Sequence, residues 1–170
     1  MISILKKLIL VLFLLNSSLA SDPIKITLVE RISQFIEWPY LDNEFAIGVY
    51  KNEELKNEMI ETYMGKTIHK LPIKIYNIQN DKDIELNKLN LIYFTNEISA
   101  DIDQVLKKIN KSPILIITEF PNDVYQGMHV GLYYENQRIK FMINQKALED
   151  INLKASYKIL KLAKIVKVEK

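Results

Sequence analysis

The stretch that decides the fold is Gly127–Val166, GMHVGLYYENQRIKFMINQKALEDINLKASYKILKLAKIV, which joins two strand patterns to a helix pattern with almost no spacer. Apolar residues alternate with other residues from His129 to Tyr134, and again from Arg138 to Asn144. A period of two predicts strands with one buried face. Only a short polar segment separates the two runs, so we predict an antiparallel hairpin rather than a crossover.

A helix with one apolar face is predicted behind the hairpin, because five residues recur there at helical spacing: Ala155, Ile159, Leu160, Ala163 and Val166. Lysines 154, 158, 161, 164 and 167 lie on the opposite side. We interpret them as a solvated helix face, and a surface for an anionic partner is the alternative.

The first twenty residues have the pattern of a secretory signal peptide. Lys6 and Lys7 precede an uninterrupted apolar run over residues 8–15, and the small residues Ser18 and Ala20 follow it. The apolar run is far shorter than the roughly 20 residues that a membrane span needs. We therefore expect cleavage after Ala20 and export to the periplasm, with an uncleaved anchor as the alternative.

The mature chain, residues 21–170, is predicted to be one domain in which helices and strands alternate. We expect helices over 23–37, 53–64 and 98–109, and strands over 45–50, 72–78, 89–95 and 113–118. Pro39 should end the first helix. The predicted fold class is α/β: a single three-layer sandwich with a mixed, mostly parallel sheet and a C-terminal antiparallel hairpin followed by a helix.

Composition excludes several classes of function. Lys6 and Lys7 account for the formal net charge of +2, so the mature chain is balanced and offers no general electrostatic case for nucleic-acid binding. Cysteine is absent, which excludes disulfides, thiol nucleophiles and cysteine metal sites.

No catalytic motif is visible, and we predict that the protein is not an enzyme and needs no cofactor or metal. His69 and His129 stand in no ligand spacing, and we interpret both as ordinary loop or strand-edge residues. The carboxyl edge of the parallel strands is where an α/β protein would hold a small ligand. The residues expected there are Lys51, Asn52, Thr95, Asn96, Thr118 and Glu119. The alternative is that these polar residues cap the helices that follow.

Two stretches resemble the YfiR-like family of bacterial periplasmic proteins. The first is the glycine-rich entry, the Phe-x-Ile-Asn strand end and the segment LKASYKILKLA, in which Ile159 replaces the usual leucine. The second is ISQFIEWP, with Phe35, Trp38 and Pro39. The motif residues expected to have structural roles are Pro39, Gly127, Gly131, Phe141, Asn144 and Ser156. For Gly127 and Gly131 we expect a bulge or a close backbone approach. For Asn144 we expect a helix cap, with a partner contact as the alternative.

The resemblance implies a regulator that acts through protein contact. Its namesake restrains a membrane-bound diguanylate cyclase and so limits cyclic-di-GMP synthesis, and relatives occur beside or fused to sensor kinases and cyclases. We therefore expect an inner-membrane diguanylate cyclase or sensor kinase as the partner, with a small-ligand-binding module as the alternative function. The resemblance also makes a homodimer plausible. Some relatives are attributed redox control through disulfides, which this chain, lacking cysteine, does not share.

Three aromatic residues are the predicted partner contacts: Phe35, Trp38 and Phe120. For Trp38 there is a structural alternative, in which the indole plugs the end of the hydrophobic core.

Overall fold

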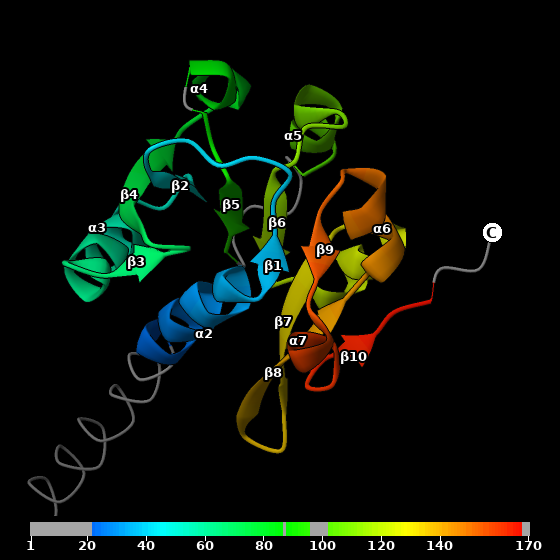
Figure 1. Ribbon diagram of the computed structural model, residues 1–170. Coiled ribbons are helices and arrows are strands. Elements are labelled where there is room, and N and C mark those ends of the chain that lie inside the picture. Colours follow the sequence, from blue (N-terminus) through cyan, green and yellow to red (C-terminus); the bar gives the residue numbers. More distant parts are fainter. Residues whose placement is uncertain (1–21, 87, 96–101, 168–170) are drawn as a thin grey trace, which may run out of the picture.

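The computed structural model describes residues 22–86, 88–95 and 102–167 (Figure 1). Its helices are α2 (Asp22–Gln34), α3 (Glu53–Tyr63), α4 (Asp81–Leu86), α5 (Ile102–Ile109), the 3-10 helix η2 (Pro121–Gln126), α6 (Gln145–Asp150) and α7 (Tyr157–Leu160). Its strands are β1 (Ile36–Glu37), β2 (Phe45–Tyr50), β3 (Thr67–Ile68), β4 (Leu71–Ile78), β5 (Leu91–Phe94), β6 (Leu115–Thr118), β7 (Val130–Glu135), β8 (Arg138–Ile143), β9 (Lys154–Ala155) and β10 (Lys164–Ile165). Residues 98–101 of the predicted helix and Asn96 of the predicted pocket lie outside the described residues.

Eight strands form one sheet in the order β10-β8-β7-β6-β5-β2-β4-β3. All neighbouring pairs from β4 through β7 run parallel. The hairpin of β7 and β8 is antiparallel, as is the pair of β3 and β4. The prediction of a mixed, mostly parallel sheet with a C-terminal antiparallel hairpin is confirmed.

Two apolar cores lie on opposite faces of this sheet and make the fold a three-layer sandwich. One core joins α2, α3 and α6 to side chains such as Ile47 and Tyr93. The other joins α4, α5 and η2 to side chains such as Ile92 and Ile116. Because successive strand residues face opposite sides, Ile92 and Tyr93 belong to different cores. This double coverage explains why β2, β5 and β6 are buried over their whole length.

The prediction of a long helix behind the hairpin is wrong. Between Ala155 and Val166, where that helix was expected, only α7 is helical, and the short strands β9 and β10 flank it. The residues taken as one helical face point into different cores, since Ile159 packs with α2 and Val166 packs with α5. Pairing with distant strands is the reason: β9 is antiparallel to β1, and β10 is parallel to β8.

The first described helix, α2, also ends earlier than predicted. It stops at Gln34, because Ile36 and Glu37 form β1 and pair with Ala155 and Lys154 of β9. Figure 1 shows β1 (light blue) and β9 (orange) side by side. Pro39 therefore follows a strand rather than ending a helix.

Asn144 has the capping role that we expected. Its Oδ1 accepts the Ala147 N–H at 3.0 Å and so caps α6, while its Nδ2 donates to the Val124 carbonyl at 3.1 Å. The side chain is 2% exposed, so both bonds are made away from water. Asn144 therefore fixes η2 against the end of the hairpin.

The two motif glycines meet different backbone requirements. Gly127 follows η2 with φ 112°, a left-handed conformation that glycine adopts without a Cβ clash. A Cβ on Gly131 would lie 2.6 Å from Val124 Cγ2 and 3.0 Å from Pro121 Cα. The close approach expected at the first strand of the hairpin is thus found at Gly131, where η2 packs directly on β7.

The other two motif residues of the C-terminal segment are the buried Phe141 and the partly exposed Ser156. Phe141 is 7% exposed and belongs to the core on the α2 side of the sheet. The Ser156 N–H donates to the Phe35 carbonyl at 2.8 Å, which continues the contact between β1 and β9. No helix among the described residues has the length and apolar character needed to span a bilayer.

Candidate functional site

The predicted ligand pocket falls at the carboxyl edge of the parallel strands, as the topology requires. Val49 of β2 is level with Tyr93 of β5, and Phe94 is level with Thr118 of β6. The residues after these strands therefore meet at one edge of the sheet. Asn96 is the member of the set that lies outside the described residues.

Most of the described polar groups at this edge are engaged within the protein. Asn52 Oδ1 accepts the Leu55 N–H at 3.0 Å and caps α3. Thr118 Oγ1 accepts the Phe120 N–H at 3.0 Å and shapes the turn into η2. Asn52 has the helix-capping role that we gave as the alternative to ligand binding, whereas Thr118 bonds within a turn and does not cap η2, whose N-cap is Phe120.

Glu119 is held in a buried cluster that our sequence analysis missed. Lys25 of α2 donates from Nζ to Glu119 Oε2 at 2.5 Å, and the Tyr93 hydroxyl donates to Oε1 at 2.7 Å. The Lys25 and Glu119 side chains are 10% and 8% exposed, and Tyr93 is fully buried. The cluster ties α2 to β5 and β6 at the carboxyl edge.

Such a cluster is suited to positioning α2 rather than to chemistry. Both carboxylate oxygens of Glu119 accept hydrogen bonds from groups of the same chain, which compensates the burial of its charge. One signal in the sequence pointed to it. Lys25 shares its helix face with Val29 and Ile32, both fully buried, so a charged residue there needed a buried partner.

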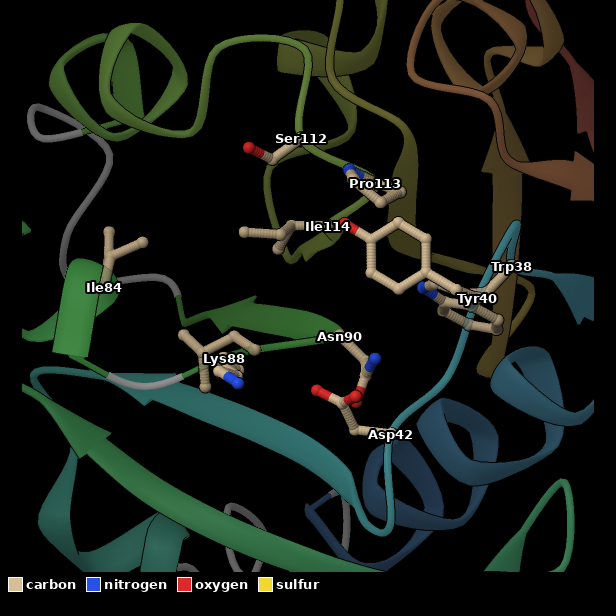
Figure 2. A pocket seen from close by; sticks show the side chains of 10 residues that line it. Trp38, Tyr40, Asp42, Ile84, Lys88, Asn90, Ser112, Pro113 and Ile114 are labelled. Carbon is tan, nitrogen blue, oxygen red and sulfur yellow. The ribbon is translucent and has the colours of Figure 1, made fainter.

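A cavity of about 460 Å³ lies at the opposite, amino edge of the sheet. Figure 2 shows Trp38 and Tyr40 on one side of it and Ile84 of α4 on the other. Its further lining residues are Asp42, Lys88, Leu89, Asn90, Ser112, Pro113 and Ile114. Aromatic and aliphatic walls with a few polar groups are typical of small-molecule sites.

Asn90 gives this cavity a rigid floor. Its Oδ1 accepts the Ala46 N–H at 2.8 Å, and its backbone N–H donates to the Ala46 carbonyl at 2.9 Å. Its own carbonyl accepts the Leu115 N–H at 2.9 Å. One residue therefore links the starts of β2, β5 and β6. Sequence reasoning missed this edge because α/β proteins bind ligands at the carboxyl ends of their strands.

Neither histidine is part of a reactive set. His129 is 3% exposed, and its Nδ1 accepts the Ile116 N–H at 2.9 Å, next to the pairing of β6 and β7. Burial lowers the pKa of His129 from 6.5 to about 4. His129 lies in the bend directly before β7, so it is a strand-edge residue as we expected, and a buried one. Among the described residues, no group of three or more His, Cys, Asp or Glu could hold a metal ion.

A family model described as YfiR/HmsC-like matches residues 22–164. The chain belongs to the YfiR/HmsC-like family. The match spans every described helix and all strands up to the start of β10. Members of this family are periplasmic regulators of cyclic-di-GMP cyclases. No curated protein matches the sequence significantly.

A solved structure titled as the ABC domain in complex with L-Trp from Streptococcus pneumoniae has a similar fold. It aligns with a TM-score of 0.58 at 12% sequence identity and covers 85% of the YfiR/HmsC-like chain. The alignment covers 60% of that structure's own chain. At this identity the similarity concerns the fold alone.

Of the predicted partner contacts, Phe35 and Trp38 lie at one end of the YfiR/HmsC-like domain and Phe120 lies toward the other. Phe120 adjoins Glu119, which binds the first turn of α2, whereas Phe35 and Trp38 follow the end of that helix. A 13-residue helix is about 20 Å long. The three residues do not form one patch, and their role in partner binding stays a prediction.

Trp38 packs as the core-plug interpretation expects. Its ring meets Phe45 edge-on at 5.1 Å between centroids and also lies 5.7 Å from His69. The indole is half-buried against the core on the α2 side of the sheet, and its buried Nε1 has no hydrogen-bond partner among the described residues. A second cavity, of about 350 Å³, lies between Trp38, Pro39 and the start of β9.

Proposed function

We propose that the mature chain is a periplasmic regulatory protein that binds and restrains an inner-membrane signalling enzyme. A diguanylate cyclase, and with it cyclic-di-GMP synthesis, is the first expected target, and a sensor kinase is the second. The match to the YfiR/HmsC-like family over residues 22–164 carries this proposal. The signal pattern of residues 1–20, with a cut after Ala20, supports export.

Restraint by contact needs a bound and a free state whose free energies differ by a few kcal/mol. The trigger for release is not a thiol of this chain, because the sequence contains no cysteine. Partner concentration, homodimer formation and a small ligand can each shift such an equilibrium by mass action. A regulator of this kind needs no cofactor and no catalytic centre of its own.

The direct test is recovery of the partner from membranes. Full-length chain with a C-terminal affinity tag is expressed in its own host, crosslinked and purified from solubilised inner membrane. We expect a cyclase or kinase to be enriched, and its reconstituted activity to fall when the mature chain is added. The proposal is wrong if the enriched enzyme keeps its full activity at saturating mature chain.

A second candidate function, binding of a small ligand, is favoured by the cavity at the amino edge. Its volume of about 460 Å³ is within the range of known ligand pockets. Its lining includes two oppositely charged side chains, Asp42 and Lys88. Native mass spectrometry of chain purified from the periplasm would detect a bound molecule. We expect Tyr40→Ala, at a side chain 67% exposed, to release that molecule without unfolding the domain.

A further inference from the structure

One end of the sheet leaves a strand edge largely uncovered. β4 pairs with β2 from Ile73 to Ile78 on its inner side. On its outer side, β3 pairs only with Leu71 and Pro72. Beyond Pro72, no strand among the described residues pairs with that outer side. Figure 1 shows β3, β4 and α3 together at this end of the molecule.

The backbone groups along this edge alternate in direction. The Lys51 N–H donates to the Ile78 carbonyl at 2.8 Å, so Ile78 directs its backbone groups toward β2. Every second residue of a strand faces the same way, so Ile73, Ile75 and Asn77 direct theirs outward. Pro72, which has no backbone N–H, lies within the part that β3 already covers.

An apolar groove runs beside the open edge. It encloses about 440 Å³ between the last turn of α3 and β4, and Ile60, Met64, Ile73 and Ile75 are among its lining residues. Met64 is 77% exposed and Ile60 is 43% exposed. An exposed strand edge beside a helix with free apolar side chains is the arrangement by which a sheet accepts an extended peptide as an additional strand.

The charges at the groove favour one kind of occupant. Its charged lining residues are Lys66 and Lys74, both lysines. Their ion-pair partners, Glu30 at 2.9 Å and Glu44 at 3.4 Å, do not line the groove. A second copy of the chain would bring the same lysines against each other, which is unfavourable, whereas carboxylates on an incoming strand would complement them.

We propose that the outer edge of β4 and the α3 groove bind an extended, acidic segment of a partner protein as an added strand. Its backbone bonds to Ile73, Ile75 and Asn77, its apolar side chains enter the groove beside Met64, and its carboxylates lie near Lys66 and Lys74. That this partner is a membrane signalling enzyme rests on the proposed function. The edge, the groove and the charges do not depend on it.

The test begins with a phage-displayed library of random peptides of about ten residues, selected on the mature chain. We expect enriched peptides to alternate apolar with other residues and to carry Asp or Glu. Amide hydrogen exchange with the best peptide bound should slow at Ile73, Ile75 and Asn77. This alternation distinguishes strand addition from binding in the groove alone.

Two matched pairs of variants separate backbone from side-chain contributions. Ile75→Pro removes both the isoleucine side chain and the outward backbone N–H, whereas Ile75→Ala removes most of the side chain and keeps the N–H. The proline variant should therefore bind the peptide at least about tenfold more weakly than the alanine variant. Met64→Glu places a carboxylate in the groove and should weaken binding about tenfold. Leu162→Glu, at a residue equally exposed at 76%, should leave binding unchanged.

The proposal is overturned if no peptide is enriched, or if the enriched peptides bind all four variants equally. It is also overturned if no peptide binds and the chain forms a dimer that Met64→Glu dissociates, because the occupant would then be a second copy. Recovery of a cyclase or kinase from membranes is a separate result. If peptides bind at β4 but no signalling enzyme is recovered from membranes, strand addition at β4 is supported and the proposed function is wrong.

Discussion

Lys25 and Glu119 are far apart in the sequence and share a buried ion pair between α2 and the end of β6. Removing one member leaves the other charge buried without compensation, which typically costs about 3–5 kcal/mol. We therefore expect Glu119→Ala to lower the free energy of unfolding in urea by about that amount. The double variant Lys25→Met, Glu119→Leu should recover most of the loss, because no unpaired charge remains.

A different result would redefine the role of the pair. If Glu119→Ala unfolds at nearly the same urea concentration as the unmodified chain, the pair is not needed to position α2. Glu119 would then regain its standing as a ligand-binding residue. Tyr93→Phe, which removes only the hydroxyl that donates to Glu119, is the milder control.

His129 makes stability depend on pH. Its pKa is about 4 in the folded chain and 6.5 ordinarily, so the unfolded chain binds a proton first as pH falls. Its contribution is complete above about pH 6.5 and is lost progressively down to about pH 4, on the order of 3 kcal/mol in all. Urea unfolding between pH 7.5 and pH 4 measures this loss.

The matched variant for that measurement is His129→Gln. Its amide oxygen can accept the Ile116 N–H as Nδ1 does, and it does not titrate. We expect the variant to be less stable than the unmodified chain at neutral pH and to lose less stability on acidification. Equal slopes in the two proteins would show that other groups, among them the carboxylates, govern the acid response.

At the scale of elements, the packing of η2 on β7 depends on the absence of a side chain at Gly131. A methyl group there would meet Val124 Cγ2 at 2.6 Å and the Pro121 backbone at 3.0 Å. We expect Gly131→Ala to lower the thermal midpoint, with a cost of about 1–3 kcal/mol. Combining it with Val124→Ala should relieve only part of the clash, because Pro121 remains in place.

The sequence was sufficient for those elements whose signals are local. β2, β4, β5, β6 and the hairpin appeared as apolar runs or alternations near their observed bounds. The two errors, the long C-terminal helix and the late end of α2, both arise from strand pairing with other parts of the chain. β1 and β9 pair with each other across almost the whole chain, and no local periodicity reports such a partner.

The candidate site was less predictable than the fold. The predicted topology places Thr95, Thr118 and Glu119 at one edge of the sheet, where the structure has them. Whether a polar side chain there is available to a ligand depends on its hydrogen bonds within the chain, which the topology does not give. The partner of Glu119 is on α2, which sequence spacing could not place. The cavity at the amino edge combines Trp38 and Asn90 through tertiary packing alone.

For the molecule as a whole, the role of Trp38 decides where a partner can dock. Its edge-on contacts with Phe45 and His69 are formed without any partner. We expect Trp38→Ala to lower the free energy of unfolding by about 2–3 kcal/mol, since the half-buried ring leaves a cavity. An unchanged thermal midpoint, with weaker recovery of the membrane enzyme, would instead identify Trp38 as a docking residue.

The pairing of Ile36 with Ala155 has a consequence for the order in which the domain is completed. The chain is synthesised from its N-terminus, so β1 remains without its neighbour until nearly all later residues have emerged. The helices and strands in between can assemble first, and the pairing of β1 with β9 forms last. A nascent or truncated chain that stops before Lys154 would present Ile36, fully enclosed in the finished domain, as an open apolar end for chaperones and proteases to find.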